Sequence, residues 1–147
     1  MGVSVTNGGA MEMVQAGNAV MPFLVMSNEL STAKILWCPA DENRFLATNF
    51  SSLSGSNLSY FVGVDVTNEN NPNLILSGDC NFEIGGKSVV SGLLSSGTHD
   101  PMAWQPNRHK KRGNLGMGDG STQSVTQSGL RVYVDGTGVA TNRWAIP

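Results

Sequence analysis

Charged residues are scarce in this chain, since Asp, Glu, Lys and Arg make up 14% of its 147 residues. Cysteine is scarcer still, with only Cys38 and Cys80, and their spacing matches no zinc motif. No stretch approaches the ~20 consecutive apolar residues of a membrane-spanning helix, and no signal-peptide pattern is visible. Low charge together with 18 glycines and several β-branched runs is typical of a β-rich, loop-rich extracytoplasmic protein.

The length predicts one domain with one core, spanning residues 1–147. Within it we expect an N-terminal arm and short helix over residues 1–30 and a sheet region over residues 31–147. The two cysteines leave two readings open. In an oxidising compartment they could form one disulfide that closes a long loop; otherwise they are two buried free thiols.

The formal charge of -2 is distributed unevenly. Residues 1–100 carry three bases against nine acids, a net charge of -6, whereas residues 101–147 carry six bases against two acids, a net charge of +4. Four of these bases form the one dense run of charge, Arg108, Lys110, Lys111 and Arg112, interrupted only by His109.

The pattern of residues 11–38 predicts one helix and one strand. A short helix over about 19–30 can hold Pro22 in its first turn and places Phe23, Met26 and Leu30 on one face. Residues 34–38 resemble a short buried strand that Pro39 ends. A polar surface loop is expected over residues 40–57.

The clearest strand covers residues 58–66 (LSYFVGVDV), in which apolar side chains alternate with others at the period of a half-buried strand. A turn over 67–73 and a returning strand from Leu74 complete an antiparallel pair, which residues 82–84 extend. Residues 93–108 show no period and are expected to be irregular. By propensity, residues 130–134 (LRVYV) form a short strand.

Residues 114–125 predict a hairpin centred on Asp119 and Gly120. Asp-Gly tolerates the positive φ angles of a type I′ turn. A three-residue loop with Gly120 in the left-handed region is the alternative, and the apolar positions do not decide between the two.

Several of these segments together resemble a known family. His109, nine intervening residues and Asp119-Gly120 match the H-X9-DG signature of prepilin-type processing-associated proteins, relatives of type II secretion pseudopilins. The blocks Trp37–Asp41 (WCPAD), LSYFVGVDV and Leu76–Asp79 (LSGD), and the ending ATNRWAIP, look like the other recurrent blocks in the same order. The resemblance covers residues 30–147.

This resemblance implies a pilin-like headpiece, an α+β fold in which a short N-terminal helix packs on an antiparallel sheet of four or five strands. Family members begin with a hydrophobic helix that anchors them in the inner membrane and later packs in a filament. This sequence shows neither that helix nor a prepilin cleavage site. Either both belong to a longer parent protein or the chain is a stand-alone variant.

Architecture is therefore the expected role of the family motif residues, which are Cys38, Pro39, Asp41, His109, Asp119 and Gly120. Asp119 is expected to shape its turn and His109 to hydrogen-bond near the base of the strand. Neither nucleophile motifs nor paired histidines at metal spacing occur, so no enzyme activity is expected. Calcium is the favoured metal candidate, with Asp119 and Asp135 as possible ligands, because some pseudopilin headpieces bind it.

The function expected is that of a structural subunit of a bacterial secretion or type IV pilus-like apparatus, and its partners are other pilin-like subunits or apparatus proteins. The basic run (Arg108, Lys110, Lys111, Arg112) could bind nucleic acid or an anionic polysaccharide, but it lacks interleaved aromatics and the protein is acidic overall. A solvated loop, or a face that contacts the acidic half of a neighbouring subunit, is the favoured reading. The alternative is a secreted carbohydrate- or surface-binding module, in which exposed Trp104 and Trp144 would stack on sugars.

Overall fold

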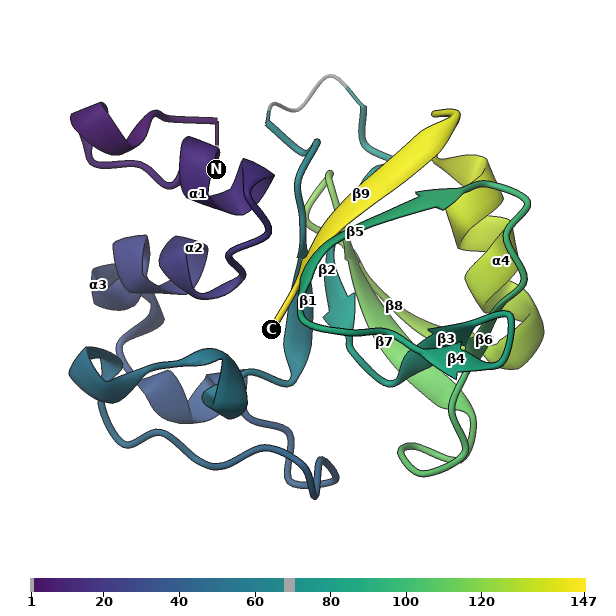
Figure 1. Cartoon of the computed structure of the whole chain (residues 1–147), viewed down its shortest axis with the longest axis horizontal. Helices are drawn as coiled ribbons and strands as arrows, with labels where there is room; N and C mark the ends of the chain where they lie inside the picture. Colours follow the sequence, from purple (N-terminus) through teal and green to yellow (C-terminus); the bar gives the residue numbers. More distant parts are fainter. Residues whose placement is uncertain (1, 68–70) are drawn as a thin grey trace.

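A six-stranded antiparallel sheet forms the centre of the molecule in the computed structural model, which describes residues 2–67 and 71–147 (Figure 1). Its strands lie in the order β5 (Gly92–Gly97), β9 (Thr141–Ile146), β1 (Tyr60–Gly63), β2 (Ile75–Asp79), β7 (Arg112–Met117) and β8 (Thr122–Thr126). A smaller sheet has the order β4 (Lys87–Ser88), β3 (Phe82–Ile84) and β6 (Met102–Trp104).

Short helices cover one face of the large sheet and form the N-terminal layer, residues 2–57, on the left in Figure 1. They are α1 (Met11–Gln15), α2 (Val20–Val25), α3 (Ser27–Leu30) and the 3₁₀ helices Val5–Asn7, Ala33–Leu36, Phe50–Ser52 and Gly55–Asn57. Val14 and Leu36 of this layer pack against Leu58, Val62 and Ala145 in a first core. No helix in residues 2–67 and 71–147 is long and apolar enough to cross a membrane.

The other face of the sheet packs against the small sheet and against α4 (Gln127–Gly136), on the right in Figure 1. Four aromatic side chains, Phe61, Phe82, Trp104 and Trp144, make the second core, with ring centroids 5.5–6.3 Å apart. Edge-to-face contacts of this kind add to the burial of apolar area.

Strand β1 contributes to both cores, because successive side chains of a strand point to opposite faces. Phe61 lies in the second core and Val62 in the first. The predicted antiparallel pairing with the strand after residue 73 is confirmed, with Phe61 opposite Gly78. The strand is shorter than residues 58–66, and both of its faces are buried rather than one. Part of the predicted turn over 67–73 lies outside the described residues.

The predicted fold class is wrong. The described residues form nine strands in two antiparallel sheets, and α4 is the only helix of seven or more residues among them. A helix packed on a sheet of four or five strands is therefore not the architecture. The predicted helix over 19–30 is instead two short helices, α2 and α3, that meet at Met26.

A 3₁₀ helix stands where a strand was predicted over 34–38. Thr32 Oγ1 accepts a hydrogen bond from Lys34 N at 3.3 Å and caps Ala33–Leu36. The carbonyl of Leu36 then accepts from Ser59 N at 3.0 Å. The buried apolar residues of this segment are consistent with either element, and the cap favours the helix.

A helix also replaces the strand predicted over 130–134. Thr126 Oγ1 accepts a hydrogen bond from Gly129 N at 3.3 Å and caps α4. Leu130 and Val134, four residues apart, are buried, whereas Val132 is 68% exposed. This is the periodicity of a helix, because a strand would place all three side chains on one face.

Residues 93–108 were predicted to be irregular, and this is also wrong. They contain most of β5, which pairs with β9 from Gly92 to Gly97, and all of β6. Residues 82–84 do not extend β2 but form β3 of the small sheet. The sequence of β5 shows no alternation of apolar and polar residues because most of its residues are serine or glycine. The strand is therefore recognisable only from its pairing with β9.

The predicted hairpin is confirmed, with β7 and β8 as its strands. Its turn is the three-residue alternative and not type I′. Gly120 has a left-handed φ of 83°, Asp119 has no positive φ, and Met117 N donates to Ser121 O at 2.8 Å. Asp119 Oδ1 accepts from Ser121 N at 2.8 Å and so stabilises the turn.

Candidate functional site

A buried group of polar side chains lies where the N-terminal layer meets the segment between β6 and β7. The polar cluster, as this group is called below, comprises Cys38, Asp41, Ser59, Asp79, Asn81, Arg108 and His109. All of them except His109 are more than 90% buried. Buried polar groups are costly unless paired, so their contacts define what the cluster does.

Arg108 and Asp41 form the central ion pair, with 2.8 Å between Nη2 and Oδ2 and side-chain exposures of 7% and 1%. Arg108 Nη1 also donates to Ser59 O at 3.5 Å. The pair joins the WCPAD block of the N-terminal layer to the segment before β7. Arg108 is therefore not on the surface, where it was predicted to contact a partner.

The thiol of Cys38 lies 3.4 Å from His109 Nε2. Ser59 hydrogen-bonds to the backbone of both cysteines. Its Oγ accepts a hydrogen bond from Cys38 N, and its carbonyl oxygen accepts one from Cys80 N, each at 3.0 Å. Both cysteines are free thiols in the structure, Cys38 buried and Cys80 half-buried, so of the two readings left open the disulfide is not formed. Burial raises the pKa of the Cys80 thiol far above its ordinary value, so it is not a nucleophile near neutral pH.

Asp79 lies at the end of β2 and is 1% exposed. Its Oδ2 accepts from Asn114 N at 2.7 Å and from Asn114 Nδ2 at 3.2 Å. Burial raises the pKa of this carboxyl, while the hydrogen bonds from Asn114 and the charges of His109 and Arg108 oppose the rise. Asp79 thus attaches β7 to the end of β2.

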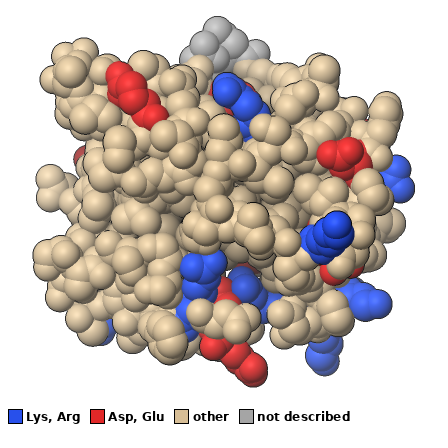
Figure 2. Space-filling view, viewed as in Figure 1, with Lys and Arg blue, Asp and Glu red and all other residues tan. Residues whose placement is uncertain are grey.

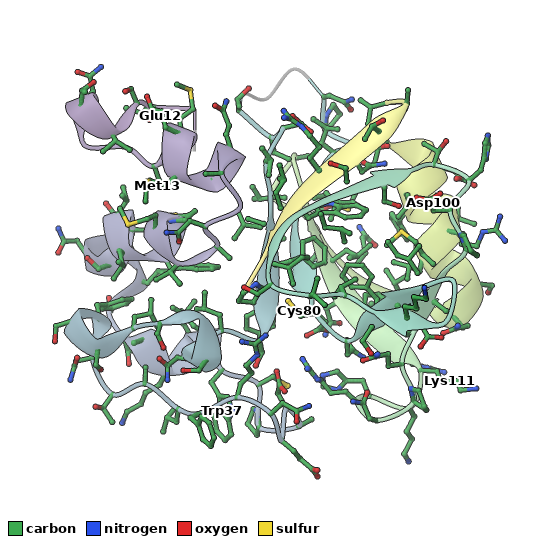
Figure 3. The ribbon with its side chains drawn as sticks, in the orientation of Figure 1. Glu12, Met13, Trp37, Cys80, Asp100 and Lys111 are labelled. Atoms are coloured by element: carbon green, nitrogen blue, oxygen red, sulfur yellow. The ribbon has the colours of Figure 1, made fainter. Side chains whose placement is uncertain are left out.

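Residues 109–111 form a surface loop beside the cluster, and with Arg112, the first residue of β7, they make up the cationic tip. His109, Lys110 and Lys111 all adopt left-handed φ angles of 52°, 53° and 62°. Figure 3 labels Lys111 at the lower right, on the far side of the molecule from Glu12. Lys110, Lys111 and Arg112 are exposed, and their contact with a partner stays a prediction.

Asp119 and Gly120 lie at the opposite end of β7 from His109. The six residues of β7 separate the two, which corresponds to roughly 20 Å of strand. His109 and Asp119 therefore cannot act as an acid/base pair. Each sits where its structural role was predicted, His109 at the base of the hairpin and Asp119 in its turn.

Metal ligands do not converge in the described part of the chain, where no group of three or more His, Cys, Asp or Glu side chains could hold an ion. Calcium ligation by Asp119 and Asp135 stays a prediction, since such a site also draws on backbone carbonyls.

The two tryptophans that the carbohydrate-binding alternative requires to be exposed are both core residues. Trp104 is 1% exposed and Trp144 is 2% exposed. Gly113 lets the Trp104 ring pack directly on β7, because a Cβ at Gly113 would lie 2.5 Å from that ring. The observation on which the carbohydrate-binding alternative depended is thus absent.

Sequence reasoning missed the partners within the polar cluster. Asn81 stands in a segment with no motif of its own, Ser59 was only a polar position of the strand predicted over 58–66, and Arg108 was assigned to the basic run. One signal was available, since Cys38, Asp41, Asp79 and His109 all belong to blocks that carry the family resemblance.

Comparison of the chain with protein families, curated proteins and solved structures finds no match.

Proposed function

We propose that the protein is a structural subunit, without enzyme activity, that works by association with copies of itself in an extracytoplasmic pilin-like or secretion-type assembly. The resemblance of its ordered sequence blocks to H-X9-DG proteins supports this role. The observation that carries it is an exposed apolar surface on the N-terminal layer.

The apolar surface comprises Val3, Val25 and Met26, each 39–52% exposed, which together line one hollow. Two hollows, of about 280 and about 320 Å³, lie along it, and Pro22 and Met26 line both. The second hollow continues to Val62, Val66 and Leu76 of the sheet. The surface is therefore continuous from the N-terminal segment to β2.

A second copy of the chain fits this surface better than a small ligand does. Soluble proteins rarely expose connected apolar patches unless these serve an interaction. The same surface offers both projecting apolar side chains and hollows that could receive them, which allows two copies to complement one another. Burial of such area contributes about 25 cal/mol per Å² before the cost of association.

Sedimentation velocity tests this proposal with the intact chain. We expect self-association that grows with protein concentration up to the order of 1 mM. Met26→Glu should abolish it, because Met26 lines both hollows. Val132→Glu is the matched control, since Val132 is an exposed apolar residue on α4, across the sheet, and it should leave association unchanged. A chain that stays monomeric throughout, or two variants with equal effects, would contradict the proposal.

A further inference from the structure

The backbone of the cationic tip is strained. Three successive residues other than glycine, His109, Lys110 and Lys111, hold left-handed φ angles. Each such residue costs about 1–2 kcal/mol, and left-handed residues usually occur singly. Segments of this kind persist only where the surrounding structure enforces them, and they concentrate at functional sites.

The polar cluster enforces this conformation from both ends of the tip. Asn81 Nδ2 donates to Arg108 O at 3.3 Å and to Arg112 O at 3.0 Å, so one buried side chain clamps the residues on either side of the turn. The buried Arg108–Asp41 ion pair fixes the first end again, and Cys38 contacts the ring of His109. The buried contacts thus hold the backbone that carries three neighbouring cations, Lys110, Lys111 and Arg112.

These cations lack acidic partners among residues 2–67 and 71–147, where the two ion pairs are Arg108–Asp41 and Arg143–Asp65. Three adjacent positive charges repel one another, and an anion would relieve that repulsion. Figure 2 shows several blue side chains in the lower half of this face of the molecule, with red ones beside some of them.

A hollow of about 280 Å³ lies against the tip. Six residues line it, and none is acidic: His109, Lys110, Arg112, Gly113, Asn114 and Ser124. Tetrahedral oxyanions accept hydrogen bonds from lysine, arginine, amide and hydroxyl groups. The Asn114 amide is already oriented by its bond to buried Asp79.

We propose that the cationic tip is a binding site for a phosphate or sulfate oxyanion, held by Lys110 and Arg112 with Asn114 and Ser124. The group is either free in solution or carried on an anionic polysaccharide. Nucleic acid fits less well because no aromatic side chain lines the hollow to stack on a base. This site is separate from the apolar surface and does not depend on self-association.

Titration calorimetry of the intact chain at low ionic strength tests the site with two probes, inorganic phosphate and a heparin-derived hexasaccharide. We expect the hexasaccharide to bind and phosphate to compete with it. Lys110→Gln/Arg112→Gln should weaken binding at least about tenfold. The control Lys34→Gln/Lys87→Gln removes two exposed charges elsewhere and should change affinity less than about twofold.

Binding of phosphate alone, lost in the tip variant and kept in the control, supports a site for the free anion. Three results would overturn the proposal: neither probe binds, both double variants lose affinity equally, or only duplex DNA binds while phosphate and the hexasaccharide fail to compete. Met26→Glu should bind both probes normally, so failure of the apolar surface and failure of this site are distinguishable.

Discussion

At the scale of single residues, the protein places its ionisable groups in two very different environments. Asp41 and Arg108 are paired out of contact with water, whereas Asp65 and Arg143 pair near the surface with side-chain exposures of 32% and 41%. Separation of a buried pair leaves an unpaired charge that water cannot reach, while an exposed charge simply regains its hydration. The two pairs should therefore respond very differently to the same mutation.

Arg108→Met should lower the free energy of unfolding by about 3–5 kcal/mol, because it strands the Asp41 carboxylate in the interior. Arg143→Met should cost about 0–1 kcal/mol. Urea denaturation measures both. The double variant Asp41→Leu/Arg108→Met should recover most of the loss, and equal losses in the two single variants would show that the buried pair has no special role.

The raised pKa of Asp79 predicts that its contribution to stability decreases as pH rises, the opposite of what most carboxyl groups contribute. Burial raises the pKa of folded Asp79 above its ordinary value of 3.8. Its contribution to stability is therefore complete below the unfolded pKa and is lost as pH rises through the raised folded pKa. In urea denaturation between about pH 3 and 7, Asp79→Asn should gain stability relative to the unmodified chain as pH rises.

Asp119 provides the control of opposite sign. The hydrogen bond from the backbone N–H of Ser121 lowers the pKa of Asp119. The contribution of Asp119 to stability is present above its pKa in the unfolded chain and is lost as pH falls through its lowered pKa in the folded protein. Asp119→Asn should thus lose stability relative to the unmodified chain as pH rises. If the stabilities of the two variants changed with pH in the same direction, Asp79 and Asp119 would not have the opposite pKa shifts assigned to them.

At the scale of secondary-structure elements, caps and pairing partners override intrinsic propensity. The run LRVYV is rich in β-branched and aromatic residues, yet Thr126 starts a helix and the burial of Leu130 and Val134 completes it. Conversely, β5 (GLLSSG) has little strand propensity but pairs along its whole length with β9. Tertiary contacts supply most of the stability of both elements.

The helical assignment of residues 127–136 predicts unequal effects of alanine. Leu130→Ala should destabilise the protein by about 2–5 kcal/mol, because it empties a buried position. Val132→Ala should change stability by less than about 0.5 kcal/mol, since Val132 is exposed and alanine favours a helix. Thermal unfolding followed by circular dichroism measures both. Comparable losses would instead indicate the strand, which places both side chains on one face.

At the scale of the whole molecule, β1 joins the two cores. The adjacent residues Phe61 and Val62 are buried on opposite faces of the large sheet, and Ala145 and Trp144 of β9 are divided in the same way. Neither core can lose its packing without exposing a strand that the other requires. We therefore expect the two layers to unfold together.

Two probes on different sides of the sheet test this cooperativity in a Cys80→Ala/Trp37→Phe variant. Fluorescence then reports Trp104 and Trp144 in the second core, and thiol labelling reports Cys38 in the N-terminal layer. Both should show the same urea midpoint. Labelling of Cys38 at lower urea than the fluorescence change would reveal an N-terminal layer that unfolds independently.

The features that the sequence alone determined are local. Asp119 and Gly120 specify a hairpin because a side-chain acceptor and a residue tolerant of positive φ suffice to make the turn. The alternating residues around Phe61, followed by a polar connection, specify an antiparallel pair for a similar reason. Short-range geometry decides both, so they could be predicted before any contact was known.

Only the tertiary structure decided the rest. Whether Leu130–Val134 became helix or strand, and whether Arg108 lay in solvent or in a buried ion pair with Asp41, depended on partners far away in the chain. The position of His109 beside Cys38, 71 residues earlier, is of the same kind. Burial gives such contacts their energy, and burial is a property of the packed molecule that no single segment encodes.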